Sequence, residues 1–126
     1  MKVYDPKDMN AAFAEAYNSG DIENLQALYE PDAVLVPTMG QVVEGTVAIR
    51  VALTQLLALK GRMKSENQYA LLHRDIALFR AKVHLVGTAP DGSSIEIHNH
   101  TAEVVRRQPD GRWLYVVDHP YGADPI

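Results

Sequence analysis

The stretch FAEAYNSGD (residues 13–21), followed by LQALYEPDA (residues 25–33), decides the fold of this chain. Gly20 favours the left-handed backbone conformation that ends a helix, and Asp21 is a typical cap at the start of the next helix. Two consecutive helices are therefore predicted. The second helix is expected to end at Pro31-Asp32, where a short, buried, β-branched strand over residues 33–36 begins.

Apolar residues at helical spacing define the face that each helix should bury. Asp5 and Pro6 mark the start of the first helix, as its cap and its first helical position. A third helix is predicted over residues 47–60, and Gly61 is expected to end it. The predicted buried faces are Met9, Ala12, Phe13, Ala16 and Tyr17 in the first helix, Ile22, Leu25, Leu28 and Tyr29 in the second, and Ile49, Leu53, Leu56 and Leu57 in the third.

After Gly61 the pattern changes from helical spacing to alternation, which is typical of β-strands. A small hairpin precedes this region, with strands at residues 33–36 and 42–44. Pro90-Asp91-Gly92 and Pro109-Asp110-Gly111 are turn signals, so consecutive long strands should pair as an antiparallel meander. The four long strands are predicted at residues 63–72, 75–88, 95–107 and 112–119.

Three helices followed by a long sheet predict an α+β fold with a single domain spanning residues 1–126. The helices should cover one face of a curved sheet, and the hollow between them is where a ligand would bind. Alternation places His84 on the outer face of its strand. The inward set on that strand is Phe79, Ala81, Val83 and Leu85.

Composition excludes several classes of protein. The net charge is −4 and the basic residues are scattered, which disfavours nucleic-acid binding. The chain has no cysteine, so disulfides, thiolate catalysis and cysteine metal sites do not arise. No apolar run approaches the ~20 residues of a membrane span, and the N-terminus lacks a signal core. A soluble cytoplasmic protein is expected.

Short motifs in one order span nearly the whole chain. They are Tyr17-Asn18-Ser19-Gly20-Asp21, Leu25 with Leu28-Tyr29, Pro31-Asp32-Ala33, Glu44-Gly45 with Ile49-Arg50, and Asp110-Gly111-Arg112-Trp113 through Val117-Asp118-His119. Through them the chain resembles the nuclear transport factor 2-like superfamily, in particular its SnoaL-like and ketosteroid-isomerase-like branches of small bacterial proteins. The resemblance implies a cone-shaped barrel of cystatin-like type, in which three helices from the N-terminal half cover a curved antiparallel sheet. It also implies a homodimer formed through the outer sheet face.

The resemblance does not determine the activity, because such proteins include isomerases, cyclases, dehydratases, hydrolases and non-catalytic modules. The ketosteroid isomerase uses an aspartate base and an oxyanion hole made of a tyrosine and a protonated aspartic acid. Counted from the Asn18–Asp21 motif, Phe13 stands at the tyrosine position and Pro37 at the base position. Neither side chain can move a proton, so that mechanism is disfavoured here.

His119 is the predicted general acid or base, since an imidazole titrates near neutral pH. Alternation from an inward Trp113 places Tyr115 and His119 on the pocket face and Asp118 on the other face. A dyad of Asp118 and His119 would need a bulge. Otherwise Glu103, on the neighbouring strand, is the carboxylate that could orient His119.

Other side chains complete the expected site. Tyr17 or His100 would position an oxygen of the substrate, and the expected substrate-binding residues are Phe13, Trp113, Tyr115 and Glu103. The predicted function is binding of a small hydrophobic molecule, with isomerase-, cyclase- or dehydratase-like chemistry by proton transfer. The alternative is a non-catalytic binding or dimerisation module, which an interior filled by Met39, Phe79 and Trp113 would favour.

A third alternative is a metal-binding protein. His98 and His100 are two residues apart, which puts both imidazoles on one face of a strand. The surrounding pattern resembles part of a cupin motif, but its glutamate comes too early and no second histidine motif follows. We therefore expect no resident metal and no cofactor.

Overall fold

The computed structural model describes residues 2–125. A 3-10 turn, η1 (Pro6–Asp8), leads directly into helix α1 (Met9–Ser19). The side chain of Asp5 accepts a hydrogen bond from the Lys7 amide, as expected of a cap. Gly20 ends α1 in the left-handed conformation, at φ 74°, and Asp21 caps helix α2 (Ile22–Gln26). The sequence prediction of two consecutive capped helices is confirmed.

The second helix is shorter than predicted. It ends at Gln26, and strand β1 (Tyr29–Thr38) begins before Pro31. A proline lacks the backbone N–H that a sheet hydrogen bond requires, so it is tolerated in a strand only at an edge or a bulge. Here Pro31 lies in the irregular part of β1, where the register against its neighbour shifts between Tyr29 and Val34. Tyr29 was therefore wrongly assigned to a helix face.

The predicted hairpin is confirmed as β1 and β2 (Gln41–Glu44), which pair antiparallel. Helix α3 (Thr46–Leu57) follows and buries Ile49 and Leu53. It ends before Gly61, so the predicted limit at Lys60 was wrong. Gly61 serves a different purpose: a Cβ there would lie 2.5 Å from the Val86 carbonyl oxygen, so only glycine permits this close approach to the sheet.

The remaining strands form one curved sheet with β1 and β2, in the order β2-β1-β7-β6-β4-β3, with β5 attached to β4. All neighbours are antiparallel except β1 and β7, which run parallel. The sheet does not close on itself, because β2 and β3 are its two ends. The bounds are β3 (Arg62–His73), β4 (Ile76–Thr88), β5 (Ser94–His100), β6 (Ala102–Arg107) and β7 (Trp113–His119).

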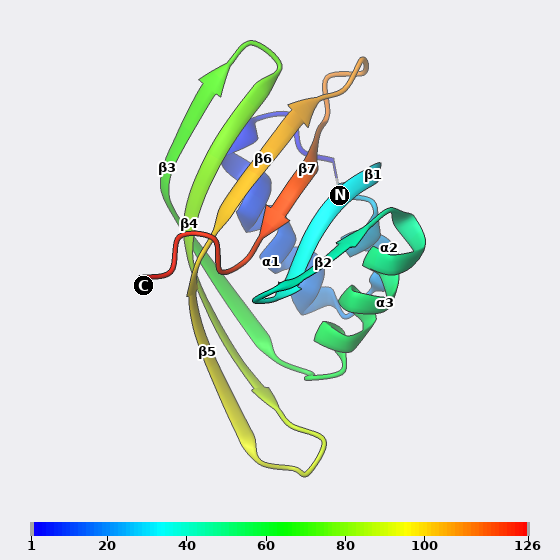
Figure 1. The fold of residues 1–126 in the computed structure, drawn as a ribbon, viewed down its shortest axis with the longest axis vertical. Helices are drawn as coiled ribbons and strands as arrows, with labels where there is room; N and C mark the ends of the chain where they lie inside the picture. Colours follow the sequence, from blue (N-terminus) through cyan, green and yellow to red (C-terminus); the bar gives the residue numbers. More distant parts are fainter. Residues whose placement is uncertain (1, 126) are drawn as a thin grey trace.

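The strand predicted over residues 95–107 is divided at Thr101. Its amide donates to the Ala81 carbonyl, while its side-chain oxygen, in place of a backbone carbonyl, accepts from the Ala81 amide at 2.9 Å. Figure 1 shows the result: β4 is long and bent, with β5 beside its lower half and β6 beside its upper half. The break lets β6 turn toward β7 while β5 extends away with β4.

The core lies between the helices and the inner face of the sheet, and includes Leu25, Ile49, Leu53, Phe79 and Val105. This arrangement confirms the predicted α+β class with helices from the N-terminal half. Along residues 2–125, every helix is too short or too polar to span a lipid bilayer.

Candidate functional site

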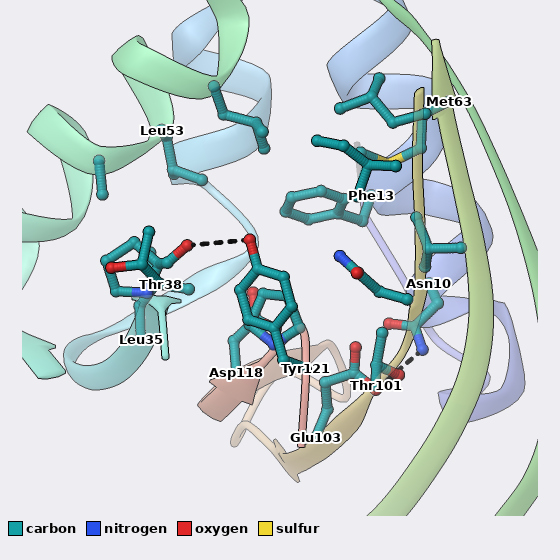
Figure 2. A pocket seen from close by; sticks show the side chains of 18 of the residues that line it. Asn10, Phe13, Leu35, Thr38, Leu53, Met63, Thr101, Glu103, Asp118 and Tyr121 are labelled. Carbon is teal, nitrogen blue, oxygen red and sulfur yellow. Dashed lines mark hydrogen bonds between the residues drawn. The ribbon is translucent and has the colours of Figure 1, made fainter. Parts of the chain in front are cut away.

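A cavity of about 300 Å³ lies between α1, α3 and the inner face of the sheet. Most of its wall is apolar, and its two carboxyl groups lie together at one end. Figure 2 shows Asp118, Glu103, Thr101 and Asn10 together at the bottom of the view, with Phe13, Leu53 and Met63 at the top. Met39 is exposed and does not fill this space, so the interior is not packed solid.

Asp118 reaches the cavity because β7 contains a bulge. Val104 of β6 is opposite Val117, whereas Val105 is opposite Tyr115, so β7 carries one extra residue between them. An extra residue reverses the alternation of side chains beyond it. Tyr115 and Asp118 therefore both line the cavity. The predicted orientation, with His119 inward and Asp118 outward, was wrong for this reason.

Glu103 faces Asp118 directly across the β6–β7 pair. Both carboxyl groups line the cavity, and each residue is 4% exposed. Glu103 is thus not aligned with His119, whose cross-strand partner is Ala102. Two carboxyl groups in one buried, largely apolar site are a recurring arrangement for acid–base chemistry.

Each carboxyl group has one oxygen held by the protein. The Tyr29 hydroxyl donates to Oδ2 of Asp118 at 2.5 Å. Oε1 of Glu103 accepts from the Thr101 hydroxyl at 2.6 Å and from the Asn10 amide at 3.1 Å. Within residues 2–125, no hydrogen bond is made by Oδ1 of Asp118 or Oε2 of Glu103. These two oxygens remain for a ligand.

A tyrosine connects the helix to the pair. The Tyr115 hydroxyl donates to Oδ1 of Asn10 at 2.5 Å, and the Asn10 amide group in turn donates to Glu103. Asn10 is therefore fixed in orientation by both of its polar atoms. The Tyr29 and Tyr115 rings are in contact, with centroids 5.1 Å apart. α1, β1, β6 and β7 thus hold one rigid polar end of the cavity.

Burial controls the protonation of the pair. Burial, and then the charge of Asp118, raise the pKa of Glu103 to about 8. Burial also raises the pKa of Asp118 to about 6, against the opposing effect of its hydrogen bond from Tyr29. Near neutral pH the pair therefore holds one proton, on Glu103. Since Oε1 already accepts two hydrogen bonds, the proton belongs on Oε2, which is available to the cavity.

Two further polar features lie away from the pair. The Ser65 hydroxyl oxygen lines the cavity and is buried, with no hydrogen-bond partner in the described chain. A buried polar atom without a partner is unfavourable, and a ligand could satisfy it. At the rim, Tyr121 donates to the Pro37 carbonyl at 3.2 Å, which places the C-terminal segment over one side of the cavity.

Of the predicted substrate-binding residues, Phe13, Tyr115 and Glu103 line the cavity. Trp113 is buried in the core and does not line the cavity. The predicted catalytic residues lie elsewhere. The Tyr17 hydroxyl donates to the Leu56 carbonyl at 3.0 Å and accepts from the Gly61 amide at 3.2 Å, so it anchors the end of α3.

His100 and His119 also lie outside the cavity wall. His100 faces the C-terminal segment, where its amide donates to Asp124 and its carbonyl accepts from the Ala123 amide. His119 packs against Gly122, and its Nδ1 is buried with no partner in the described residues. The structure does not bring these histidines together with Tyr17.

Sequence reasoning missed Asp118, Tyr29 and Asn10. Asp118 was assigned to the wrong face because a bulge carries no clear sequence signal. Tyr29 was assigned to a helix that ends three residues earlier. Asn10 was overlooked, although its place three residues before Phe13 on a buried helix face could have marked it.

The family model described as a SnoaL-like domain matches residues 10–116, which include the residues that hold the cavity's polar end except Asp118. The chain belongs to the SnoaL-like family. No curated protein sequence matches this SnoaL-like chain significantly.

Solved structures share the fold of this SnoaL-like domain at low identity. A ketosteroid isomerase-like protein from Erwinia carotovora atroseptica has a TM-score of 0.78 and 18% identity, covering 88% of each chain. A protein from Streptomyces avermitilis, provisionally assigned as a dehydratase of the nuclear transport factor 2-like family, has a TM-score of 0.74 and 20% identity, also covering 88% of each. A conserved protein from Planctomyces limnophilus has a TM-score of 0.78 and 19% identity, with the same coverage.

Proposed function

We propose that the cavity binds a small, largely hydrophobic molecule carrying one oxygen, and that Asp118 and Glu103 catalyse proton transfer on it. The observation that carries the proposal is the buried cross-strand pair with two free carboxyl oxygens in an apolar cavity. The assigned dehydratase and the ketosteroid isomerase-like protein of the same fold support this class of chemistry.

The roles follow from the two pKa values. Asp118, with its pKa near 6, is ionised at neutral pH and acts as the base that takes a proton from a carbon next to the substrate's carbonyl. Glu103, with its pKa near 8, keeps its proton and donates a hydrogen bond from Oε2 to that carbonyl oxygen. Asp118 then returns the proton to the same or a conjugated carbon. The proton removed is the proton returned, so this reaction uses no cofactor.

A non-catalytic binding protein is the second candidate. It is favoured by Phe13 and Pro37, which line the cavity at the positions where the resemblance to the ketosteroid isomerase expects proton-moving groups. In that case the carboxyl pair would only hydrogen-bond a ligand, and proton exchange would be absent.

Exchange of α-hydrogens for deuterium separates the two candidates. Wild-type protein in D₂O should accelerate exchange of 1-indanone or 2-cyclohexenone, followed by proton NMR. Asp118→Asn should lower the rate by about 100-fold or more, the usual contribution of a general base. His119→Ala should retain the rate. Absence of exchange in wild type would leave only binding, and loss of exchange in His119→Ala alone would restore the histidine hypothesis.

A matched pair of variants on α3 tests binding itself. Ala52 lines the cavity, whereas its neighbour Val51 is 56% exposed. Ala52→Trp should fill the cavity and weaken binding of 1-indanone by about tenfold or more, while Val51→Trp should leave it unchanged. Equal affinities in both variants would contradict binding in this cavity.

We also propose a homodimer formed through the outer sheet face. Leu71, Leu78, Val104 and Val117 are in register and form one apolar row across β3, β4, β6 and β7. Leu78→Glu should convert the dimer to a monomer in sedimentation analysis. Val47→Glu, on an exposed position of α3, is the matched control and should remain dimeric.

A further inference from the structure

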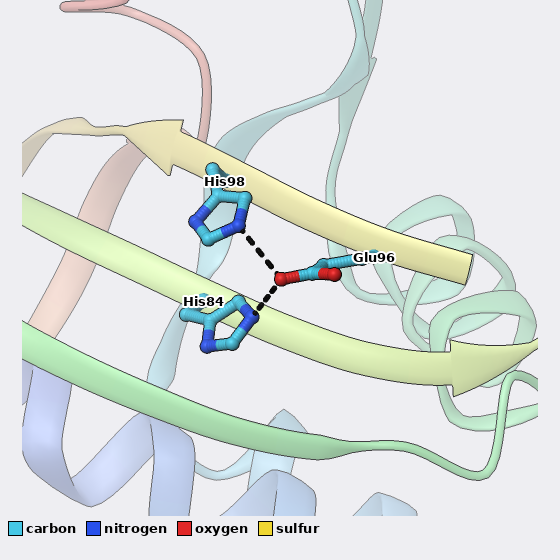
Figure 3. A group of neighbouring side chains, drawn as sticks. All are labelled: His84, Glu96 and His98. Carbon is cyan, nitrogen blue, oxygen red and sulfur yellow. Dashed lines mark hydrogen bonds and ion pairs between the residues drawn. The ribbon is translucent and has the colours of Figure 1, made fainter. Parts of the chain in front are cut away.

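Three side chains with metal-binding groups meet on the outer face of the β4–β5 hairpin. His84 of β4 is the direct cross-strand partner of His98 of β5, and Glu96 precedes His98 by two residues on the same strand face. Figure 3 shows both imidazoles directed at the carboxylate of Glu96. The site lies on the opposite face of the sheet from the cavity, and it does not depend on the proposed function.

The donor atoms converge on one point. Nε2 of His84 lies 2.9 Å from Oε1 of Glu96, and Nε2 of His98 lies 3.0 Å from the same oxygen. The three donor atoms all lie within 4.8 Å of one another. The two rings are stacked, with centroids 4.3 Å apart and planes inclined by 7°. The stacked rings of His84 and His98 therefore direct their Nε2 atoms at the same carboxylate oxygen.

We propose that His84, Glu96 and His98 form a binding site for a divalent transition-metal ion, with Zn²⁺ as the best match. Zinc bonds to imidazole nitrogen and carboxylate oxygen are about 2.0–2.2 Å, which places tetrahedral ligand atoms roughly 3.3 Å apart. The two nitrogen–oxygen separations are shorter than this by a few tenths of an ångström, so side-chain rotations would bring these atoms to the ion. The ion replaces the hydrogen-bonding protons on the two Nε2 atoms, each imidazole being neutral and protonated on Nδ1 instead.

The chemistry of the three ligands restricts the ion. Two imidazoles and one carboxylate favour zinc, cobalt or nickel over calcium or magnesium, which prefer oxygen ligands alone. The site supplies three protein ligands and leaves a fourth position open to water. Lys64 is the cross-strand neighbour of His84 on β3, and its positive charge lowers the affinity relative to an isolated site.

A bound ion would strengthen a weakly supported part of the sheet. β5 pairs with β4 and lies outside the main strand order, so it has one partner strand. The inner face of this hairpin supplies Val83, Leu85 and Ile97 to the cavity wall. Cross-linking its outer face through His84 and His98 would therefore hold the cavity wall in place.

Calorimetric titration of ZnSO₄ into protein without a histidine tag tests the site. We expect one ion per chain, and tetrahedral visible absorption bands when Co²⁺ replaces Zn²⁺. His84→Ala, His98→Ala and Glu96→Gln should each weaken Zn²⁺ binding at least tenfold, because loss of even an outer-shell partner typically costs 10–100-fold. His100→Ala is the matched control, a histidine two residues from His98 on the same strand, and should bind as wild type.

The variants should fold normally, because Glu96 and His98 are mostly exposed and the His84 side chain is 40% exposed, and circular dichroism checks this. The proposal is overturned if wild type does not bind Zn²⁺, or if His84→Ala and Glu96→Gln bind it as wild type does. A loss in His100→Ala equal to that in His98→Ala would also overturn it, by assigning the ion to a different pair of histidines.

Discussion

Glu103 and Glu96 lie on β6 and β5, two strands separated only by the break at Thr101, yet on opposite faces of the sheet. Glu103 is 4% exposed, and burial raises its pKa to about 8. The Glu96 side chain is 59% exposed, and hydrogen bonds from His98 and His84 hold its pKa below the usual value. A glutamate therefore keeps its proton on the inner face of the sheet, at Glu103, and is an anion on the outer face, at Glu96.

The difference shows how one sheet can provide two kinds of chemistry. On the inner face, removal of water makes the charged form costly, so the carboxyl pair keeps one proton, on Glu103. On the outer face, water stabilises the charge and the histidines add hydrogen bonds, so a stable anion is available to a cation. Variants that change one face and spare the other test this contrast.

The pH dependence of α-hydrogen exchange should be bell-shaped. Asp118 must be ionised and Glu103 protonated, so the rate should fall about tenfold per pH unit below about 6 and above about 8. Glu103→Gln, which cannot ionise, should lose the fall at high pH, while Glu96→Gln should keep both limbs. A profile unchanged in Glu103→Gln would remove Glu103 from the reaction.

Thr101→Val should destabilise the fold by about 1–3 kcal/mol, because the buried Ala81 amide loses its acceptor and Glu103 loses a donor. Urea unfolding measures the change. Thr88→Val, at an exposed position at the end of β4, is the matched control and should be near neutral. Equal stability of the two variants would show that Thr101 does not hold the junction between the faces.

Glu103→Gln should stabilise the protein at pH 8. In the unfolded chain glutamate titrates near 4.5, whereas folded Glu103 keeps its proton to about pH 8. The folded state therefore binds more protons between these values, and wild-type stability is lost as the pH rises through this range. Asp118 contributes a loss of stability in the same direction as the pH rises from 3.8 to about 6. The variant should gain about 1 kcal/mol or more at pH 8, and a loss there would contradict a buried, protonated Glu103.

Glu96→Gln should have the smallest effect on folding in metal-free buffer, because hydrogen bonds between solvent-exposed groups contribute little to stability. Thermal unfolding with EDTA measures it. With Zn²⁺ present, wild type should gain thermal stability and the variant should not. A large change without metal would mean that the outer cluster already stabilises the hairpin.

Much of the fold could be predicted from residues whose preferences are local. Asp5, Gly20 and Asp21 set the helix ends, and the turns at Asp91-Gly92 and Asp110-Gly111 set the meander. Alternation along residues 79–85 correctly placed His84 outside. These predictions hold because capping, left-handed glycine and alternation depend on the nearest few residues.

The site depended on contacts that local sequence does not contain. The bulge in β7 turned Asp118 inward, and the pairing register placed it opposite Glu103. The register of β4 and β5 made His84 the neighbour of His98, whereas the sequence had suggested His100 as its partner. Register and bulges are set by how whole strands fit against their neighbours and against the helices. The sequence by itself therefore determined the family, the order of the elements and which polar residues are present. Only the tertiary structure decided which of these polar residues meet, because burial and cross-strand distance arise only when the sheet is assembled.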